Sequence, residues 1–257
     1  MSPDAKRENA GVLLEDLTWL EAEQFLTSDA VVVIPVGSAA KEHGPHLRLN
    51  NDWLLAEYLK RRLLATENVV VAPTVSYHYY PAFVEYPGSI TLSLATATAM
   101  IADIVGSLAR YGPRRFYVLN TGISTLKALE PASSALAAEG IILQYTNLTT
   151  ALSPIEKRLL SQEGGSHADE AETSMMLYIE PASVDMAKAT RDFRPDGVGG
   201  LTRRPDGPGS YSPSGVWGDA TLATREKGEM LVEALVAHVR EEIERLRREP
   251  LDRAAGR

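Results

Sequence analysis

The stretch from Val31 to Asp52 constrains the fold of this chain more than any other. It opens with an apolar, β-branched run, Val31 to Val36, which is interrupted by Pro35 and ends at Gly37. A run this short, bounded by a breaker, predicts a strand buried on both faces. Ligand-type side chains crowd the loop that follows, and residues 53–64 then show the spacing of an amphipathic helix. In open α/β sheets, ligands bind where such a loop leaves the carboxyl end of a strand.

This loop carries the side chains of a candidate metal site. Imidazole and carboxylate ligands together suit zinc, manganese or iron. Four such residues lie close together here: Glu42, His43, His46 and Asp52. His43 and Asp52 are the first pair of candidate ligands. The alternative interpretation is that Glu42 and His46 belong to a solvated loop and that Asp52 only caps the helix.

Apolar runs alternate with helical patterns along the next hundred residues. Strands are predicted at 68–72, 116–119 and 141–145, and helices at 96–111 and 124–138, the second broken or kinked at Pro131. This alternation predicts an α/β fold in which a mostly parallel sheet carries helices on both faces. With no internal repeat and no clear linker, we expect one domain over residues 1–257, with loose tails at 1–10 and 247–257.

A second pair of site candidates begins the next helix, which is predicted from about Ala168 to Ile179. Glu172 lies at the edge of the apolar stripe of this helix, where a lone carboxylate is costly unless it is paired or coordinated. His167 stands at the helix start, and Asp169 and Glu170 are expected as charges of the first turn. The alternative is that His167 is an exposed terminal residue and Glu172 a surface carboxylate.

Two irregular segments are candidates to enclose a substrate. Residues 75–92 are aromatic and rich in proline, and His78, Tyr79 and their aromatic neighbours either line a pocket or cover the core. Residues 191–218 predict a long loop, a lid or an oligomer contact, in which Trp217 closes a pocket or simply packs. The final helix is expected to bury a stripe that includes Met230 and Leu231.

The composition excludes several classes of function. The formal net charge of −8 argues against nucleic acid or an anionic membrane as a partner. The chain has no cysteine, which excludes disulfides and thiolate metal sites. There is no apolar stretch long enough to span a bilayer and no signal peptide at the start, so a cytoplasmic protein is expected.

Five short motifs lie in a characteristic order along the chain. They are Pro35-Val36-Gly37-Ser38, Glu42-His43-Gly44-Pro45-His46-Leu47 with Asp52, Tyr86-Pro87-Gly88-Ser89-Ile90, His167-Ala168 with Glu172-Thr173-Ser174, and Gly218-Asp219 with Thr221-Leu222-Ala223-Thr224. In this order the chain resembles the creatininase (creatinine amidohydrolase) family from about Leu14 to Val239.

The resemblance implies a three-layer α/β fold, a homo-oligomer (a hexamer among the candidate assemblies) and a hydrolase site with two divalent metal ions. Family members open cyclic amides or cleave formamide and peptide-type C–N bonds. By resemblance, His43 is a ligand, Asp52 bridges both metals, Glu172 is the late carboxylate ligand and His167 assists proton transfer. A hydroxide would attack the amide carbonyl that the metals polarise, and His167 would pass a proton to the leaving nitrogen.

Two departures from the family pattern change the expected ligand set. Lys41 stands where the family has a ligand glutamate, and Glu42 is directly adjacent to His43. Gly122 stands where the family has a histidine ligand, at the end of the middle strand. Glu42 and His46 are therefore candidate replacement ligands, Glu42 is also a candidate acid or base, and one or two metal ions (zinc, manganese or iron) are expected. Ser124, His78, Tyr79 and Trp217 are expected to contact the substrate.

Three hypotheses about function follow. The first is a metal-dependent amidohydrolase that cleaves a small, cyclic amide. The second is a lyase or isomerase in which Glu42, His167 or Lys41 acts as acid or base in the same pocket. The third is a non-catalytic descendant retained for binding or assembly. Each takes a small molecule as partner, and none takes nucleic acid or a membrane.

Overall fold

The structure is a computed structural model that describes residues 10–197 and 200–251. Its central sheet has five strands in the order β1-β3-β2-β4-β5, and every neighbouring pair runs parallel. The prediction of a mostly parallel sheet is confirmed. The strands are β1 (Val12–Leu13), β2 (Val31–Val36), β3 (Val70–Val71), β4 (Arg115–Asn120) and β5 (Ile142–Tyr145).

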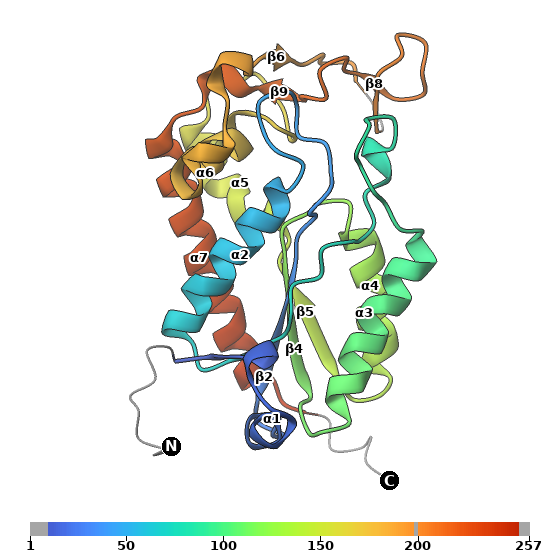
Figure 1. Ribbon diagram of the computed structural model, residues 1–257, viewed down its shortest axis with the longest axis vertical. Helices are drawn as coiled ribbons and strands as arrows, with labels where there is room; N and C mark the ends of the chain where they lie inside the picture. Colours follow the sequence, from blue (N-terminus) through green and yellow to red (C-terminus); the bar gives the residue numbers. More distant parts are fainter. Residues whose placement is uncertain (1–9, 198–199, 252–257) are drawn as a thin grey trace.

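Helices cover both faces of this sheet (Figure 1). One face packs against α2, α5, α6 and α7, and the other against α3 and α4, with the short α1 beside them. The three-layer α/β sandwich is therefore confirmed. The helices are α1 (Trp19–Phe25), α2 (Asn51–Thr66), α3 (Leu94–Ala109), α4 (Leu126–Ala137), α5 (Leu148–Leu159), α6 (Glu170–Ile179) and α7 (Arg225–Arg248).

The strand β2 lies at the centre because its side chains are apolar on both faces. Val31 and Val33 enter the core beneath α2 and α7, whereas Val32, Ile34 and Val36 enter the core beneath α3 and α4. All six residues are buried, and each pairs with a residue of β4. The predicted strand at residues 31–36 is thus confirmed, and it delivers the following loop to the carboxyl edge of the sheet.

Several helix predictions are wrong in detail. Pro131 does not break α4, which runs continuously from Leu126 to Ala137. Because proline has no N–H, the carbonyl of Lys127, four residues earlier, lacks its usual helical hydrogen bond, but Lys127 is exposed to solvent. The buried Ala128 and Leu129 hold the helix against the sheet. The helix α3 begins at Leu94, two residues before the predicted start, because Ser93 caps it.

Two predictions for α7 also need correction. Met230 does not belong to the buried stripe, since 46% of it is exposed, whereas its neighbour Leu231 is fully buried. Arg247 and Arg248 are not part of a loose tail, because α7 continues to Arg248 and the Arg247 guanidinium donates to the Asn68 carbonyl at 2.8 Å. Residues 1–9 and 252–257 of the predicted tails lie outside the described residues.

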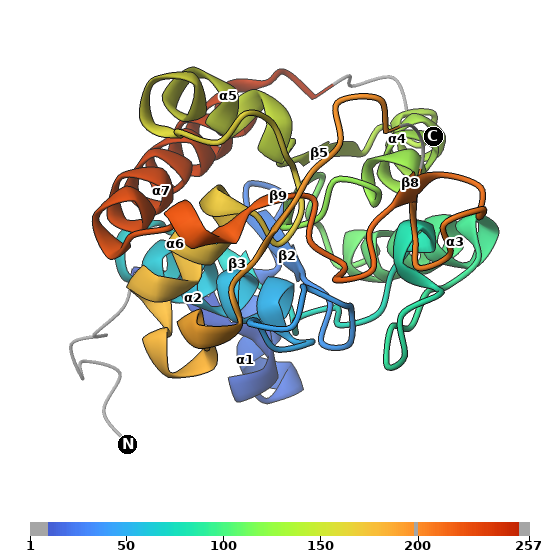
Figure 2. The same ribbon diagram turned by 90° about the horizontal axis from the view of Figure 1, so that it is seen from above.

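The long segment 191–218 is tied down by two small pairs of strands. β6 (Arg191–Asp192) pairs antiparallel with β9 (Gly218–Asp219), and β7 (Leu201–Thr202) pairs parallel with β8 (Ser210–Tyr211). Figure 2 shows this segment crossing over the end of the sheet, from the side of α6 to that of α3. Within the described ranges, no helix has the length and apolar character needed to cross a membrane.

Candidate metal centre

The candidate site lies at the carboxyl edge of the sheet, where the loops after β2 and β4 meet the start of α6. Gly37 makes the first of these loops possible. A Cβ at this position would lie 2.4 Å from the Asp52 carbonyl oxygen, in the first turn of α2. Only glycine therefore lets the chain leave β2 so close to α2. This brings Asp52 beside the residues of the loop.

His43 is held by its own loop so that one ring nitrogen faces a carboxylate. The side chain is fully buried, and Nδ1 lies 2.8 Å from the Lys41 carbonyl oxygen. A carbonyl only accepts, so Nδ1 carries the donated proton and Nε2 of the neutral ring bears a lone pair. That nitrogen lies 2.8 Å from Oδ1 of Asp52. Two acceptors at this separation repel each other unless a cation, either a proton or a metal ion, lies between them.

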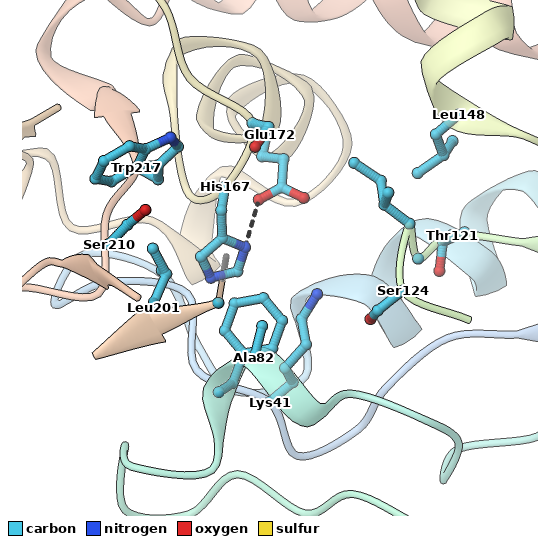
Figure 3. Close-up of a pocket in the computed structure, with 15 residues that line it drawn as sticks. Lys41, Ala82, Thr121, Ser124, Leu148, His167, Glu172, Leu201, Ser210 and Trp217 are labelled. Carbon is cyan, nitrogen blue, oxygen red and sulfur yellow. Dashed lines mark ion pairs between the residues drawn. The ribbon is translucent and has the colours of Figure 1, made fainter. Parts of the chain in front are cut away.

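His167 repeats this arrangement from the other side of the site. Its Nε2 lies 2.9 Å from the Glu42 carbonyl oxygen and 3.1 Å from Oε2 of the same residue, so Nε2 donates. Nδ1 therefore turns towards Oε2 of Glu172, 3.6 Å away (Figure 3). The two imidazole rings are 5.0 Å apart between centroids. Metal-bound histidines commonly donate their second N–H to a carbonyl or carboxylate in this way.

The backbone at the start of α6 directs His167 and Glu172 to the same point. Ala168 has a φ of 48°, a left-handed backbone conformation that residues other than glycine rarely adopt. Its N–H donates to Oε2 of Glu172 at 2.6 Å. The next residue, Asp169, caps the helix by accepting from the N–H groups of Ala171 and Glu172. The Trp217 N–H donates to the His167 carbonyl at 2.8 Å and fixes the chain from outside.

These contacts bring together a set of ligand-type atoms that fits a divalent metal ion. His43, His167 and Glu172 each offer one atom, and these atoms lie within 4.8 Å of one another. Oδ1 of Asp52, beside His43, is a fourth. Around zinc, with bonds of about 2.0–2.2 Å, ligand atoms stand roughly 3.3 Å apart. The distance from Nε2 of His43 to Oδ1 of Asp52, 2.8 Å, and that from Nδ1 of His167 to Oε2 of Glu172, 3.6 Å, lie on either side of this value. Imidazole and carboxylate donors suit zinc and manganese.

The surroundings shift the pKa of Asp52 and the pKa of His167 in opposite directions. Burial raises the pKa of Asp52, but the charge of Lys41 and the contact with His43 outweigh it and hold that pKa well below its usual range. Burial lowers the pKa of His167, yet its hydrogen bond and charge interaction with Glu42 raise it overall. Asp52 does not cap α2, because the cap position is held by Asn50.

Glu42 and His46 are buried, so the alternative of a solvated loop is wrong. The structure does not bring either of them into the cluster of ligand atoms. The Glu42 carboxylate contacts His167 at Nε2, the nitrogen that faces away from Glu172, and also accepts from the Gly44 N–H. Nε2 of His46 lies 2.8 Å from the Thr173 hydroxyl, and burial lowers the pKa of His46 to about 4.

A cavity of about 270 Å³ opens beside the cluster, and Figure 3 shows the side chains that line it. Ser124 and Trp217 line it, as does Phe83 from the aromatic segment. His78 and Tyr79 do not. His78 is fully buried, neither of its ring nitrogens has a hydrogen-bond partner among the described residues, and burial lowers its pKa to about 4. Lys41, a candidate acid or base of the sequence analysis, also lines it. Further lining residues were not expected from the sequence, because they come from separate segments: Thr121, Ile123, Leu148, Leu201 and Ser210.

Glu170 serves the scaffold of the site rather than the helix dipole alone. It is fully buried, and its carboxylate accepts from the backbone N–H groups of Ser161 and Gln162. It also forms an ion pair with Lys227 of α7. Glu170 does lie in the first turn of α6, as expected, but its burial and its ion pair with Lys227 were not expected. The apolar pattern of this helix gives no sign of these contacts, because Ser161 and Gln162 lie in the loop before the helix and Lys227 lies in α7.

Comparisons with known proteins identify similar chains along almost the whole length. A family model described as creatininase, creatinine amidohydrolase, matches residues 15–243. The chain is 29% identical to the creatinine amidohydrolase of Pseudomonas putida, over 90% of this chain and 96% of that protein. It is 27% identical to a mycofactocin precursor peptide peptidase of Mycobacterium tuberculosis, over 84% of this chain and 85% of that protein. A 3-dehydro-scyllo-inosose hydrolase of Thermotoga maritima is 26% identical, with coverage of 95% and 85%.

Solved structures agree with this similarity. A crystal structure of creatinine amidohydrolase superposes with a TM-score of 0.78 and 27% identity, over 93% of this chain and 99% of that chain. A zinc–zinc form of a mutant creatininase and a manganese form of creatininase match with TM-scores of 0.77 and 0.76, both at 27% identity. They cover 93% of this chain and 99% and 100% of theirs. The named relatives are all hydrolases.

Proposed function

Because the chain belongs to the creatininase family, we propose that it is a metal-dependent amidohydrolase that cleaves the C–N bond of a small amide. One observation supports this most strongly. His43 and His167 each donate one ring N–H to a backbone carbonyl and turn the other nitrogen to a carboxylate. Both imidazoles thus turn a free ring nitrogen to the same place, where it can bind a metal ion or a proton. A structural core has no need for two such arrangements side by side.

In this proposal His43, Asp52 and Glu172 hold the metal ion. Three protein ligands leave a position open for water or substrate, as in other catalytic zinc sites. A divalent ion there supplies Lewis-acid polarisation and a water molecule that can attack at neutral pH. Zinc and manganese are the favoured ions, because zinc and manganese forms of creatininase have this fold.

His167 has a separate role as the proton carrier. Its Nε2–H is committed to Glu42, so Nδ1 is the atom that accepts a proton from the attacking water and returns it to the leaving nitrogen. In the balanced reaction, water adds to the carbonyl carbon, the C–N bond breaks, and the nitrogen leaves with that proton. The Glu42 carboxylate stabilises the imidazolium in the interval.

The cavity favours a small and partly apolar substrate. Its volume of about 270 Å³ lies below the range of roughly 300–1,000 Å³ that is typical of drug-sized ligands. Trp217, Leu148 and Phe83 give it flat and apolar walls. We therefore propose a compact amide, with a cyclic amide as the first candidate. A short peptide end is the second, because a peptide peptidase is among the relatives.

The test is hydrolysis of a panel by protein reconstituted with zinc or manganese. The panel contains creatinine, other cyclic amides, formamides and short peptides, and the release of amine is measured with and without a chelator. We expect turnover of at least one cyclic amide that the chelator abolishes. Glu172→Gln should abolish it as well, whereas Glu156→Gln, a neighbouring carboxylate in the adjoining cavity, should retain it. Turnover that survives both the chelator and Glu172→Gln would contradict the proposal.

A further inference from the structure

Lys41 places a buried positive charge directly against the candidate metal centre. Only 4% of the residue is exposed, and Nζ lies 2.7 Å from Oδ2 of Asp52. The other carboxylate oxygen of Asp52 faces His43. Lys41 is also the one lysine or arginine that lines the cavity among the described residues. Figure 3 shows its amino group projecting into the space between His167 and Ser124.

This ammonium has more donors than partners. An ammonium carries three N–H bonds, and Asp52 is the one acceptor that contacts Nζ within the described part of the chain. The faces of Tyr80 and Phe83, with centroids 5.5 and 4.8 Å from Nζ, stabilise the charge without accepting a conventional hydrogen bond. A buried donor without an acceptor is costly. The arrangement is therefore complete only when an oxygen atom in the cavity accepts from Lys41.

The same ammonium leaves no room for a second divalent ion. An ion that shared Oδ2 of Asp52 would lie against the positive charge of Lys41. Among the described residues, the neighbouring wall formed by Thr121, Gly122 and Ser124 offers no imidazole or carboxylate ligand, and Gly122 has no side chain. Thr121 and Ser124 offer only neutral hydroxyls, whose protons point to backbone carbonyls, in place of the imidazole or carboxylate ligands that suit zinc and manganese.

We propose that Lys41 is the fixed second cation of this site, so that the centre holds one metal ion and Lys41 binds the carbonyl oxygen of the substrate. The inference rests on the proposed function and adds a catalytic residue to it. As water adds to the carbonyl, negative charge develops on that oxygen, and a preorganised ammonium beside it stabilises the transition state. Lys41 keeps its proton throughout, and no bond to it forms or breaks.

Metal stoichiometry and binding of acetohydroxamate test this inference without any substrate. Metal-free protein is titrated calorimetrically with Zn²⁺, and the bound metal is confirmed by elemental analysis. Acetohydroxamate, a small metal ligand with a carbonyl oxygen, is then titrated into the zinc-loaded protein. The variants are Lys41→Met, Lys41→Arg and the control Lys60→Met. Lys60 is a lysine of α2 that is also buried and is paired with Glu15, away from the site.

The expected result is one zinc per chain in the wild type. Lys41→Met should still bind at least one zinc, and it should bind acetohydroxamate at least tenfold more weakly, because the substitution removes a charge-assisted hydrogen bond. Lys41→Arg should weaken the binding of acetohydroxamate less, and Lys60→Met should leave it unchanged. If Lys41→Met does not fold, Lys41→Gln takes its place with the same expectations.

Two results would overturn the inference alone: two zinc ions in the wild type, or unchanged acetohydroxamate affinity in a Lys41→Met protein of equal zinc content. A wild type that binds no zinc would instead overturn the proposed function, on which the inference rests.

Discussion

At the scale of single residues, the two histidines of the centre have similar surroundings but different proposed roles. His43 faces Asp52 directly at 2.8 Å, whereas His167 stands 3.6 Å from Glu172 and is tied to a second carboxylate, Glu42. The first arrangement suits a ligand, and the second suits an imidazole that changes its protonation state. Substitution of each histidine separates these roles.

His167→Ala should retain bound zinc and lower kcat by about 10²- to 10⁴-fold, because it removes a proton carrier. His43→Ala should lose the zinc itself, since it removes a ligand. Elemental analysis of both desalted variants, beside the turnover assay, makes the comparison. Loss of zinc from His167→Ala would show that His167 is a ligand and would contradict its proposed role.

Glu156 provides a prediction about pH. Burial and the nearby charges of Asp169 and Glu172 raise the pKa of Glu156 from 4.5 to about 7. Between these pH values the folded protein keeps a proton that the unfolded chain has released, so the free energy of unfolding falls as pH rises. Glu156→Gln should therefore stabilise the metal-free protein at pH 8 by about 1 kcal/mol, after allowance for the partial exposure of Glu156.

Urea denaturation at pH 4 and pH 8 checks this expectation. At pH 4 the side chain at position 156 is neutral in both folded proteins, so the wild type and Glu156→Gln should differ little in their free energy of unfolding. Glu139→Gln, at an exposed glutamate after α4, is the control and should change nothing at either pH. Equal stabilisation by Glu156→Gln at both pH values would exclude an electrostatic cause.

At the scale of helices and strands, α6 is held in position by close packing against α7. Gly228 of α7 lies where a Cβ would come within 1.9 Å of the Ser174 carbonyl oxygen in α6. This packing fixes the helix whose first turn carries Glu172. By contrast, Gly106 in α3 has no atom within 4 Å of such a Cβ.

Gly228→Ala should lower the free energy of unfolding by about 2 kcal/mol or more, since backbone atoms cannot move aside cheaply. Gly106→Ala should raise it by about 0.5–1 kcal/mol, because alanine is the better residue in a helix interior. Both are measured by denaturant unfolding. Destabilisation of similar size by both substitutions would show that the α6–α7 contact is not special.

The sequence predicts the main elements because β2 and its neighbours are apolar on both faces and alternate with helical patterns. It does not predict α5, although Asn147 caps that helix, because Pro154 interrupts the pattern. The candidate ligands lie in short local motifs and are found without the structure. The position of Glu42 behind His167 and the contact of Lys41 with Asp52 depend on how distant loops meet. The sequence alone could not establish them.

At the scale of the whole molecule, metal binding should stabilise the folded protein. The candidate ligands come from the loop after β2, from α2 and from the start of α6, so they converge only in the folded chain. An ion at 100 times its dissociation constant adds about 2.7 kcal/mol to the free energy of unfolding. For a chain of this size that corresponds to a rise in Tm of roughly 5–10 °C.

Thermal unfolding with Zn²⁺, with a chelator and with neither measures this rise. Zn²⁺ should raise the Tm of the wild type, and the chelator should return it to its original value. The Tm of His43→Ala should not change with Zn²⁺. The expected homo-oligomer stays a prediction, and light scattering on the same samples would determine the state of assembly. If Zn²⁺ leaves the Tm of the wild type unchanged, the result would contradict a metal centre.

Anomalous diffraction from a crystal grown with zinc tests the central claim most directly. The account predicts one anomalous peak per chain, within bonding distance of Nε2 of His43 and carboxylate oxygens of Asp52 and Glu172, with Nζ of Lys41 close to Asp52. An empty position between His43 and Glu172 in a zinc-containing crystal would contradict the metal centre itself. Two peaks would show that Lys41 does not occupy the place of a second ion.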